Sequence, residues 1–133
     1  MISTYALYTY VDELDSEKVE VSGLDWEDSE DNGSEGAQSC PLIIAADCVY
    51  DPDLARALSK VLGRLLKADN PDSYALIVNT VRQLETLEAF KEGLRKVSVE
   101  WEEVIKAEEI PQLIPYDRPV ASLIWKCTKK AQI

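Results

Sequence analysis

The sequence predicts an α/β domain with a mostly parallel sheet and an antiparallel hairpin at its end. Two short apolar runs without alternation, residues 41–46 and 74–78, are typical of strands covered on both faces. Each run precedes a segment with apolar residues three and four apart, which predicts helices over 54–65 and about 84–95. The strands expected over 97–101 and 119–127 are joined by the prolyl loop 110–115 without a helix, and strands joined in this way normally run antiparallel.

The segments outside this core have weaker patterns. Residues 18–24 alternate and predict a short strand. Residues 27–39 hold no apolar residue larger than Ala37, so we expect an acidic, mobile loop. Residues 1–17 are unplaced, and residues 129–133 are expected to form a tail in solvent. The predicted domain therefore spans residues 18–128.

The net charge of −11 is concentrated in one part of the chain. Residues 12–35 carry eleven acids against one base, a net charge of −10. Such a chain will not bind nucleic acid by bulk charge. The acidic segment is either a solvated loop or a surface that attracts a lysine-rich protein, and both interpretations remain open.

Composition excludes several other classes of function. No apolar run approaches the length of a membrane span and the N-terminus lacks a secretory pattern, so we expect a soluble, cytoplasmic protein with no membrane partner. The three cysteines fit neither a disulfide framework nor a zinc site, and we expect no metal; Cys48 and Cys127 are interpreted as small core residues. The chain has no histidine, so the usual Ser–His and Cys–His pairs cannot be assembled.

The best candidate site follows the apolar run 41–46. Asp47 and Tyr50 come directly after this run, and Asp51 and Pro52 then suit the cap and first position of a helix. In open α/β sheets, ligands bind just beyond the carboxyl ends of the strands. The alternative is that Asp47 only ends a strand and that Tyr50 packs beside it.

Four short motifs resemble the seven-strand S-adenosylmethionine-dependent protein-lysine methyltransferases. They are Leu24–Glu27, Ile44–Tyr50, Asn79–Arg82 with Glu85 and Thr86, and Ile114–Asp117. The resemblance covers about residues 18–128 and is strongest to the elongation factor 2 lysine methyltransferase group. It implies a Rossmann-like methyltransferase fold, S-adenosyl-L-methionine as cofactor, and a protein substrate that bears a target lysine, with elongation factor 2 as the candidate.

The resemblance also implies residue roles. Trp26 would lie by the adenine of the cofactor with Asp25 beside it, and Ala46 would line the methionine end of the cofactor. Asp47 and Tyr50 would shape the place where the target lysine meets the methyl group. For Trp26, the alternative is an aromatic side chain that packs under the acidic loop.

These residue types suit lysine methylation. The amine attacks a methyl sulfonium in line, so the enzyme contributes mostly positioning. The lysine must first lose a proton, and a carboxylate beside an aromatic ring can orient the ammonium group before that loss. Arg82, after the run 74–78, would orient a carboxylate or the protein substrate, or form an ion pair with Glu85; both interpretations remain open.

The sequence departs from this family in one large respect. No Gly-x-Gly turn follows any predicted strand, although that turn lets the backbone approach the cofactor in such folds. We therefore expect an incomplete fold, the distal half of the domain, as in a truncated isoform that neither binds the cofactor well nor methylates alone. The alternative is a non-catalytic protein-interaction module or regulator, which competes for the substrate or for a chaperone.

Overall fold

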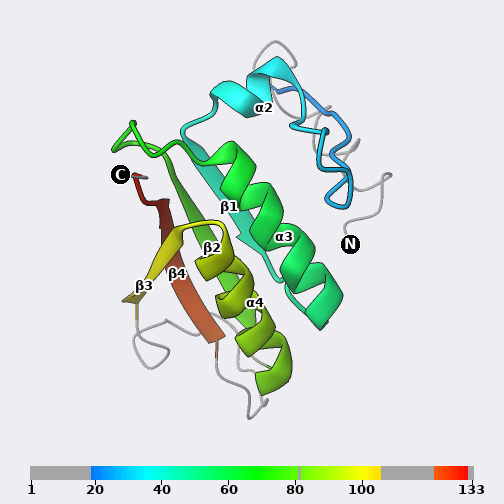
Figure 1. The fold of residues 1–133 in the computed structure, drawn as a ribbon, viewed down its shortest axis with the longest axis vertical. Coiled ribbons are helices and arrows are strands. Elements are labelled where there is room, and N and C mark those ends of the chain that lie inside the picture. Colours follow the sequence, from blue (N-terminus) through cyan, green and yellow to red (C-terminus); the bar gives the residue numbers. More distant parts are fainter. Residues whose placement is uncertain (1–18, 81, 106–121, 132–133) are drawn as a thin grey trace.

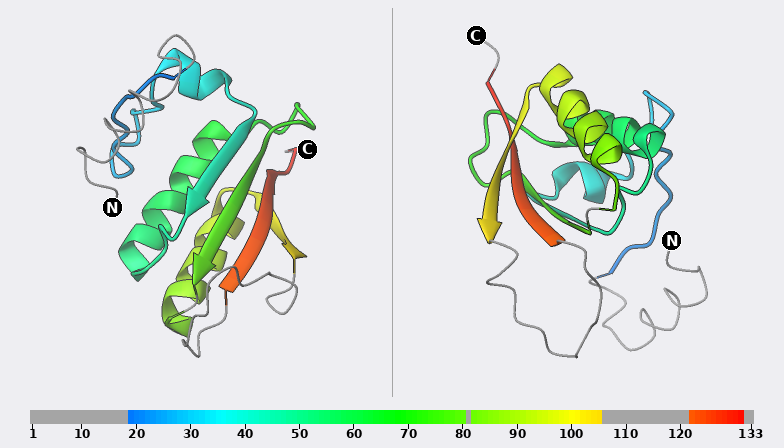
Figure 2. Two further views of the ribbon diagram at one scale, coloured as in Figure 1. Left: turned by 180° about the vertical axis from the view of Figure 1, so that it is seen from behind. Right: turned by 90° about the horizontal axis from the view of Figure 1, so that it is seen from below.

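The computed structural model describes residues 19–80, 82–105 and 122–131, which form a four-stranded sheet with helices on one face (Figure 1). The strands are β1 (Leu42–Ala46), β2 (Tyr74–Thr80), β3 (Val99–Ile105) and β4 (Ser122–Lys129). The helices are α2 (Glu35–Ser39), α3 (Pro52–Leu65) and α4 (Leu84–Lys96). Helices α3 and α4 lie side by side against the same face of the sheet, as the two views in Figure 2 show. None of these helices is long and apolar enough to cross a membrane.

The sheet has the strand order β1-β2-β4-β3. Strands β1 and β2 are parallel, whereas β4 pairs antiparallel with both β2 and β3. The predicted antiparallel pairing of the last two strands is confirmed. The prediction of a mostly parallel sheet is wrong, because β4 lies between β2 and β3 and makes two of the three pairings antiparallel.

Helix α3 begins where its sequence predicts. The Asp51 carboxylate accepts the backbone N–H of Leu54 at 2.9 Å, and Pro52 occupies the first turn, where a missing N–H costs nothing. The apolar stripe of α3 includes Leu58 and Leu62, both buried against the sheet. Both predicted helices are confirmed, with slightly different ends.

The core lies between the two helices and the inward-facing residues of β2 and β4. Alternate side chains of these strands are buried because successive residues point to opposite faces. These inward residues are Ala75, Ile77, Asn79, Leu123, Trp125 and Cys127. The Phe90 ring of α4 stacks on Trp125 with 6.1 Å between ring centroids, which fixes α4 over the second half of the sheet.

The outer face of β1 is less covered than its sequence predicts. Ile44 is 66% exposed and Leu42 is 40% exposed, whereas Ala45 is buried under the helices. The expectation that this strand is covered on both faces is therefore wrong. Among the described elements, both long helices lie on the same face of the sheet. The apolar residues of β1 that point to the other face are therefore exposed.

Three other predictions differ from the structure. Residues 19–24 form no strand, because their alternating pattern has no partner strand in the described sheet. Helix α2 forms within the expected loop 27–39, capped by Ser34, whose hydroxyl accepts the N–H of Ala37 at 3.1 Å. Lys129 belongs to β4 and not to a tail, and its ammonium group donates to the Gly63 carbonyl oxygen at 2.6 Å. Residues 1–17 and the motif 114–117 lie outside the described residues.

Candidate functional site

The chain turns sharply at Asp47, the first residue after β1. Its backbone N–H still donates to the carbonyl oxygen of Val78 at 2.7 Å, which is the last bond of the β1–β2 ladder. Its φ of 52° lies in the left-handed region, which costs most residues about 1–2 kcal/mol but which aspartate tolerates better than most. This turn leaves the Asp47 side chain 54% exposed at the carboxyl end of the strand.

Arg82 provides the cation that faces Asp47. Its Nη2 atom lies 3.5 Å from the Asp47 Oδ2 atom, and the two side chains are 52% and 54% exposed. An ion pair this exposed contributes about 0–1 kcal/mol to stability, so its main effect is to orient the two groups. The alternative pairing of Arg82 with Glu85 is not the one that the structure forms.

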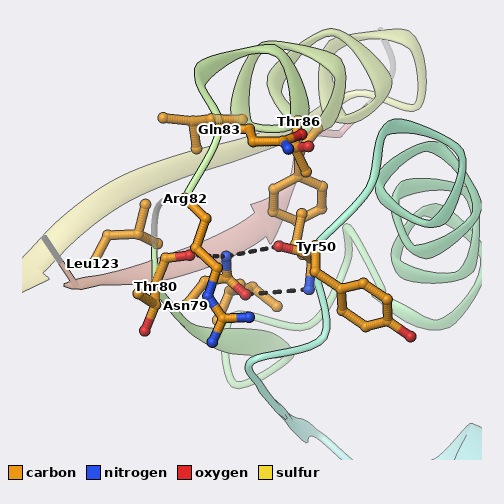
Figure 3. A pocket seen from close by; sticks show the side chains of 11 residues that line it. Tyr50, Asn79, Thr80, Arg82, Gln83, Thr86 and Leu123 are labelled. Carbon is orange, nitrogen blue, oxygen red and sulfur yellow. Dashed lines mark hydrogen bonds between the residues drawn. The ribbon is translucent and has the colours of Figure 1, made fainter. Parts of the chain in front are cut away.

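Asn79 joins β2 to the segment that contains Tyr50. Its Oδ1 accepts the Val49 N–H at 3.1 Å, and its Nδ2 donates to the Val49 carbonyl oxygen at 2.9 Å. Figure 3 shows these two bonds as dashed lines from the Asn79 amide to the backbone beside Tyr50. Asn79 begins the motif Asn79–Arg82, but the sequence predicts no separate role for it. The one feature of the sequence that could have indicated a role is the polar residue at an inward-facing position of the second apolar run.

Tyr50 lies at the mouth of a small cavity between β2, β4 and the start of α4. Tyr50 is 52% exposed, and its ring points outward, away from Gln83 and Thr86 (Figure 3). The cavity volume of about 10 Å³ is the lower limit for one water molecule. The Thr86 hydroxyl, on a residue only 4% exposed, faces this cavity and has no hydrogen-bond partner among the described residues.

The residues expected to hold the cofactor lie apart from this cavity. Trp26 is partly buried and packs against the hydrophobic core, whereas Asp25 is exposed. Ala46 is exposed as the last residue of β1. None of these three residues lines the cavity beside Tyr50.

The acidic segment around Asp25 is fixed by its own side chains. The Asp31 carboxylate accepts the N–H groups of Asp25 and Gly33, both at 2.9 Å, and these bonds lower the pKa of Asp31. The Arg64 guanidinium of α3 donates to the Asp31 carbonyl oxygen at 3.2 Å. This contact anchors the segment against α3. The part of the chain that the structure describes contains no group of three or more His, Cys, Asp or Glu side chains that could hold a metal ion.

The structure thus brings three polar side chains to the carboxyl ends of β1 and β2. Asp47 and Arg82 are paired, and Tyr50 and Arg82 line the same cavity. An exposed carboxylate and an exposed aromatic ring are each suited to hold a cationic amine. The guanidinium of Arg82 sets the orientation of that carboxylate.

Comparison with known proteins gives a consistent result. A family model described as lysine methyltransferase matches residues 8–96. The chain is 32% identical over 108 residues to the human protein-lysine N-methyltransferase EEF2KMT, covering 78% of this chain and 31% of the relative. It is 33% identical over 114 residues to the Bos taurus protein of the same name, covering 83% of this chain and 32% of the relative. The chain therefore spans about a third of the length of the curated relatives that it matches.

Proposed function

The chain belongs to the lysine methyltransferase family, and on that premise we propose that it serves S-adenosylmethionine-dependent methylation of a protein lysine. The observation that carries this proposal is the Asp47–Arg82 pair at 3.5 Å, beside Tyr50, at the carboxyl ends of two parallel strands. Ligands of open α/β sheets bind at such strand ends. In this role, Asp47 and Tyr50 receive the substrate lysine.

The geometry supports a sequence of steps for these side chains. The Asp47 carboxylate attracts the lysine ammonium and orients it by a charge-assisted hydrogen bond, while the Tyr50 ring offers its face to the cation. Arg82 contacts the same carboxylate at 3.5 Å and orients it toward the incoming ammonium group, and the lysine must release a proton to solvent before it can react. When bound, S-adenosylmethionine would supply a methyl group to the neutral amine and would leave as S-adenosylhomocysteine. The contribution of Asp47 and Tyr50 is to position that amine.

Cofactor binding is proposed for Trp26, Asp25 and Ala46. Ala46 is exposed at the end of β1, where a small side chain lets a ligand approach the backbone. The five glycines of the chain include no Gly-x-Gly turn, which is the element that approaches the cofactor in such folds. We therefore propose that these 133 residues are the distal part of the methyltransferase domain and bind S-adenosylmethionine weakly by themselves.

The proposed substrate is elongation factor 2, because both curated relatives carry a name that refers to this factor. The test is titration of the full chain with purified elongation factor 2 by isothermal calorimetry. We expect Asp47→Asn and Tyr50→Ala each to weaken binding about tenfold. A docked substrate removes both side chains from water, where a hydrogen bond to a charged group is worth about 1.5 kcal/mol and a cation–π contact up to about 2 kcal/mol.

A matched control is Asp72→Asn, which removes the same charge from an exposed turn at the opposite end of β2. This variant is expected to bind like the unmodified chain. Equal weakening by Asp72→Asn and Asp47→Asn would show a bulk charge effect and would contradict the assignment of a lysine site. Absence of any binding to elongation factor 2 would reject this substrate.

A second titration, with S-adenosylhomocysteine, tests the cofactor part of the proposal. We expect weak binding and no transfer of a labelled methyl group to elongation factor 2 by the 133-residue chain alone. Tight binding would contradict the truncated interpretation, and transfer of the labelled methyl group would make the chain an enzyme in its own right. Trp26→Ala would then be expected to weaken that binding, because the ring is proposed to lie by the adenine.

A further inference from the structure

The hydrogen bonding between β1 and β2 does not stop where β1 ends. The last backbone bond joins the Asp47 N–H to the Val78 carbonyl oxygen at 2.7 Å. One residue further along β2, the side chain of Asn79 accepts the Val49 N–H and donates to the Val49 carbonyl oxygen, at 3.1 and 2.9 Å. The amide side chain therefore takes the place of a peptide group on a neighbouring strand.

Both partners of this contact are removed from water. Asn79 is 7% exposed and Val49 is 5% exposed. The remaining N–H of the Asn79 amide donates to the Thr80 carbonyl oxygen at 3.1 Å, so the side chain has no free donor. A buried backbone group that loses its partner costs about 1–3 kcal/mol. Two such groups of Val49 depend on Asn79.

The segment held in this way carries the side chains of the proposed lysine site. Val49 points into the core, and its neighbour Tyr50 points outward and is half exposed. Asp47 precedes Val49 by two residues and holds its left-handed φ of 52°. Fixing the backbone of Val49 therefore limits where Asp47 and Tyr50 can lie.

We propose that Asn79 is a positioning residue, which holds segment 47–50 in the shape that presents Asp47 and Tyr50 to the substrate lysine. This inference rests on the proposed function. Asparagine suits this position because, among side chains of this length, it alone supplies both an acceptor and a donor in one plane at neutral pH. Leucine of similar size supplies neither, and an ionised aspartate supplies no donor.

The test measures amide hydrogen exchange by NMR in the unmodified chain and in Asn79→Leu. We expect the protection of the Val49 amide to fall tenfold or more, while amides in the middle of β2 and β4 keep theirs. The matched control is Ser73→Ala. Ser73 is 4% exposed, and its hydroxyl accepts the Lys67 N–H at 2.9 Å at the other end of β2. This control is expected to leave Val49 protected.

A third variant, Asn79→Asp, separates positioning from a merely structural role. Its ionised carboxylate cannot donate to the Val49 carbonyl oxygen, whereas the protonated acid both accepts and donates, as the amide does. We expect Val49 protection, relative to the unmodified chain at each pH, to be low at about pH 7.5 and to recover near about pH 5. Because the charged groups Asp47 and Arg82 also lie near this segment, the unmodified chain at the same pH supplies the reference for any other effect of pH on exchange.

The outcomes distinguish this proposal from the proposed function. Unchanged Val49 protection in Asn79→Leu, or equal loss in Ser73→Ala, would overturn the positioning role. Loss of Val49 protection in Asn79→Leu, together with weaker binding of elongation factor 2, would support both proposals. If the unmodified chain does not bind elongation factor 2, that substrate is rejected, whereas the exchange data still decide whether Asn79 orders segment 47–50.

Discussion

Gly93 of α4 lies where this helix crosses α3, and its replacement by alanine is expected to destabilise the protein. A Cβ atom at this position would lie 2.5 Å from the Ser59 Oγ and 2.8 Å from the Ser59 Cβ. Helix propensity alone predicts the opposite sign, since alanine is favoured over glycine in a helix by about 1 kcal/mol. The two effects therefore compete in a single variant.

The clash is expected to dominate because Ser59 cannot move away easily. Its hydroxyl donates to the Ala55 carbonyl oxygen at 2.7 Å and lies 3.3 Å from the Phe90 carbonyl oxygen, and the Cβ contact does not depend on the rotamer. Overpacking of a core typically costs about 1–3 kcal/mol. Given two contacts below 3 Å, we take the upper part of that range. After the propensity gain, the net loss is about 1–2 kcal/mol.

Urea unfolding followed by circular dichroism measures this loss. Gly23→Ala is the matched control, because no heavy atom lies within 4 Å of the added Cβ. In a Ser59→Gly background the clash is absent, so Gly93→Ala is expected to stabilise the protein by about 1 kcal/mol. If Gly93→Ala stabilises the unmodified chain, the close crossing of α3 and α4 is wrong.

Two further predictions concern titratable side chains. Burial raises the pKa of Cys127 to about 12. A thiol reagent is therefore expected to label exposed Cys40 in the native protein and to leave Cys127 unlabelled until the protein unfolds. Equal labelling rates of the two cysteines would contradict the packed core. Backbone N–H bonds lower the pKa of Asp31 in the folded state, so its contribution to stability is complete above the unfolded pKa and is lost as pH falls below that value. Asp31→Asn is expected to reduce the difference between urea midpoints at about pH 7 and about pH 3, and an unchanged difference would refute that assignment.

The helices and the buried strands were predictable because their signals are local. The stripe that includes Leu58 and Leu62, and the cap at Asp51, specify α3 without reference to the rest of the chain. The position of β4 between β2 and β3 depends on contacts distant in sequence, and no local pattern encodes it. The same limit explains β1, whose apolar run does not reveal that Ile44 is 66% exposed.

The residues of the candidate site were predictable from the sequence, but the contacts between them were not. An acid and an aromatic residue after a buried strand indicated Asp47 and Tyr50. The Asp47–Arg82 pair joins positions 35 residues apart, and the alternative pairing with Glu85, only three residues from Arg82, was equally compatible with the sequence. The role of Asn79 was not predictable, because a single polar residue at the end of an apolar strand does not indicate what its amide contacts.

The exposed face and edge of β1 affect how this protein behaves in concentrated solution. Among the described strands, β1 is one edge of the sheet, and its five residues contain neither proline nor charge. Natural edge strands usually carry such residues, because an open apolar edge invites a strand of another molecule to pair with it. Here the net charge of −11 makes the molecules repel one another, which opposes such pairing. High salt, which screens that repulsion, is therefore expected to promote self-association through β1.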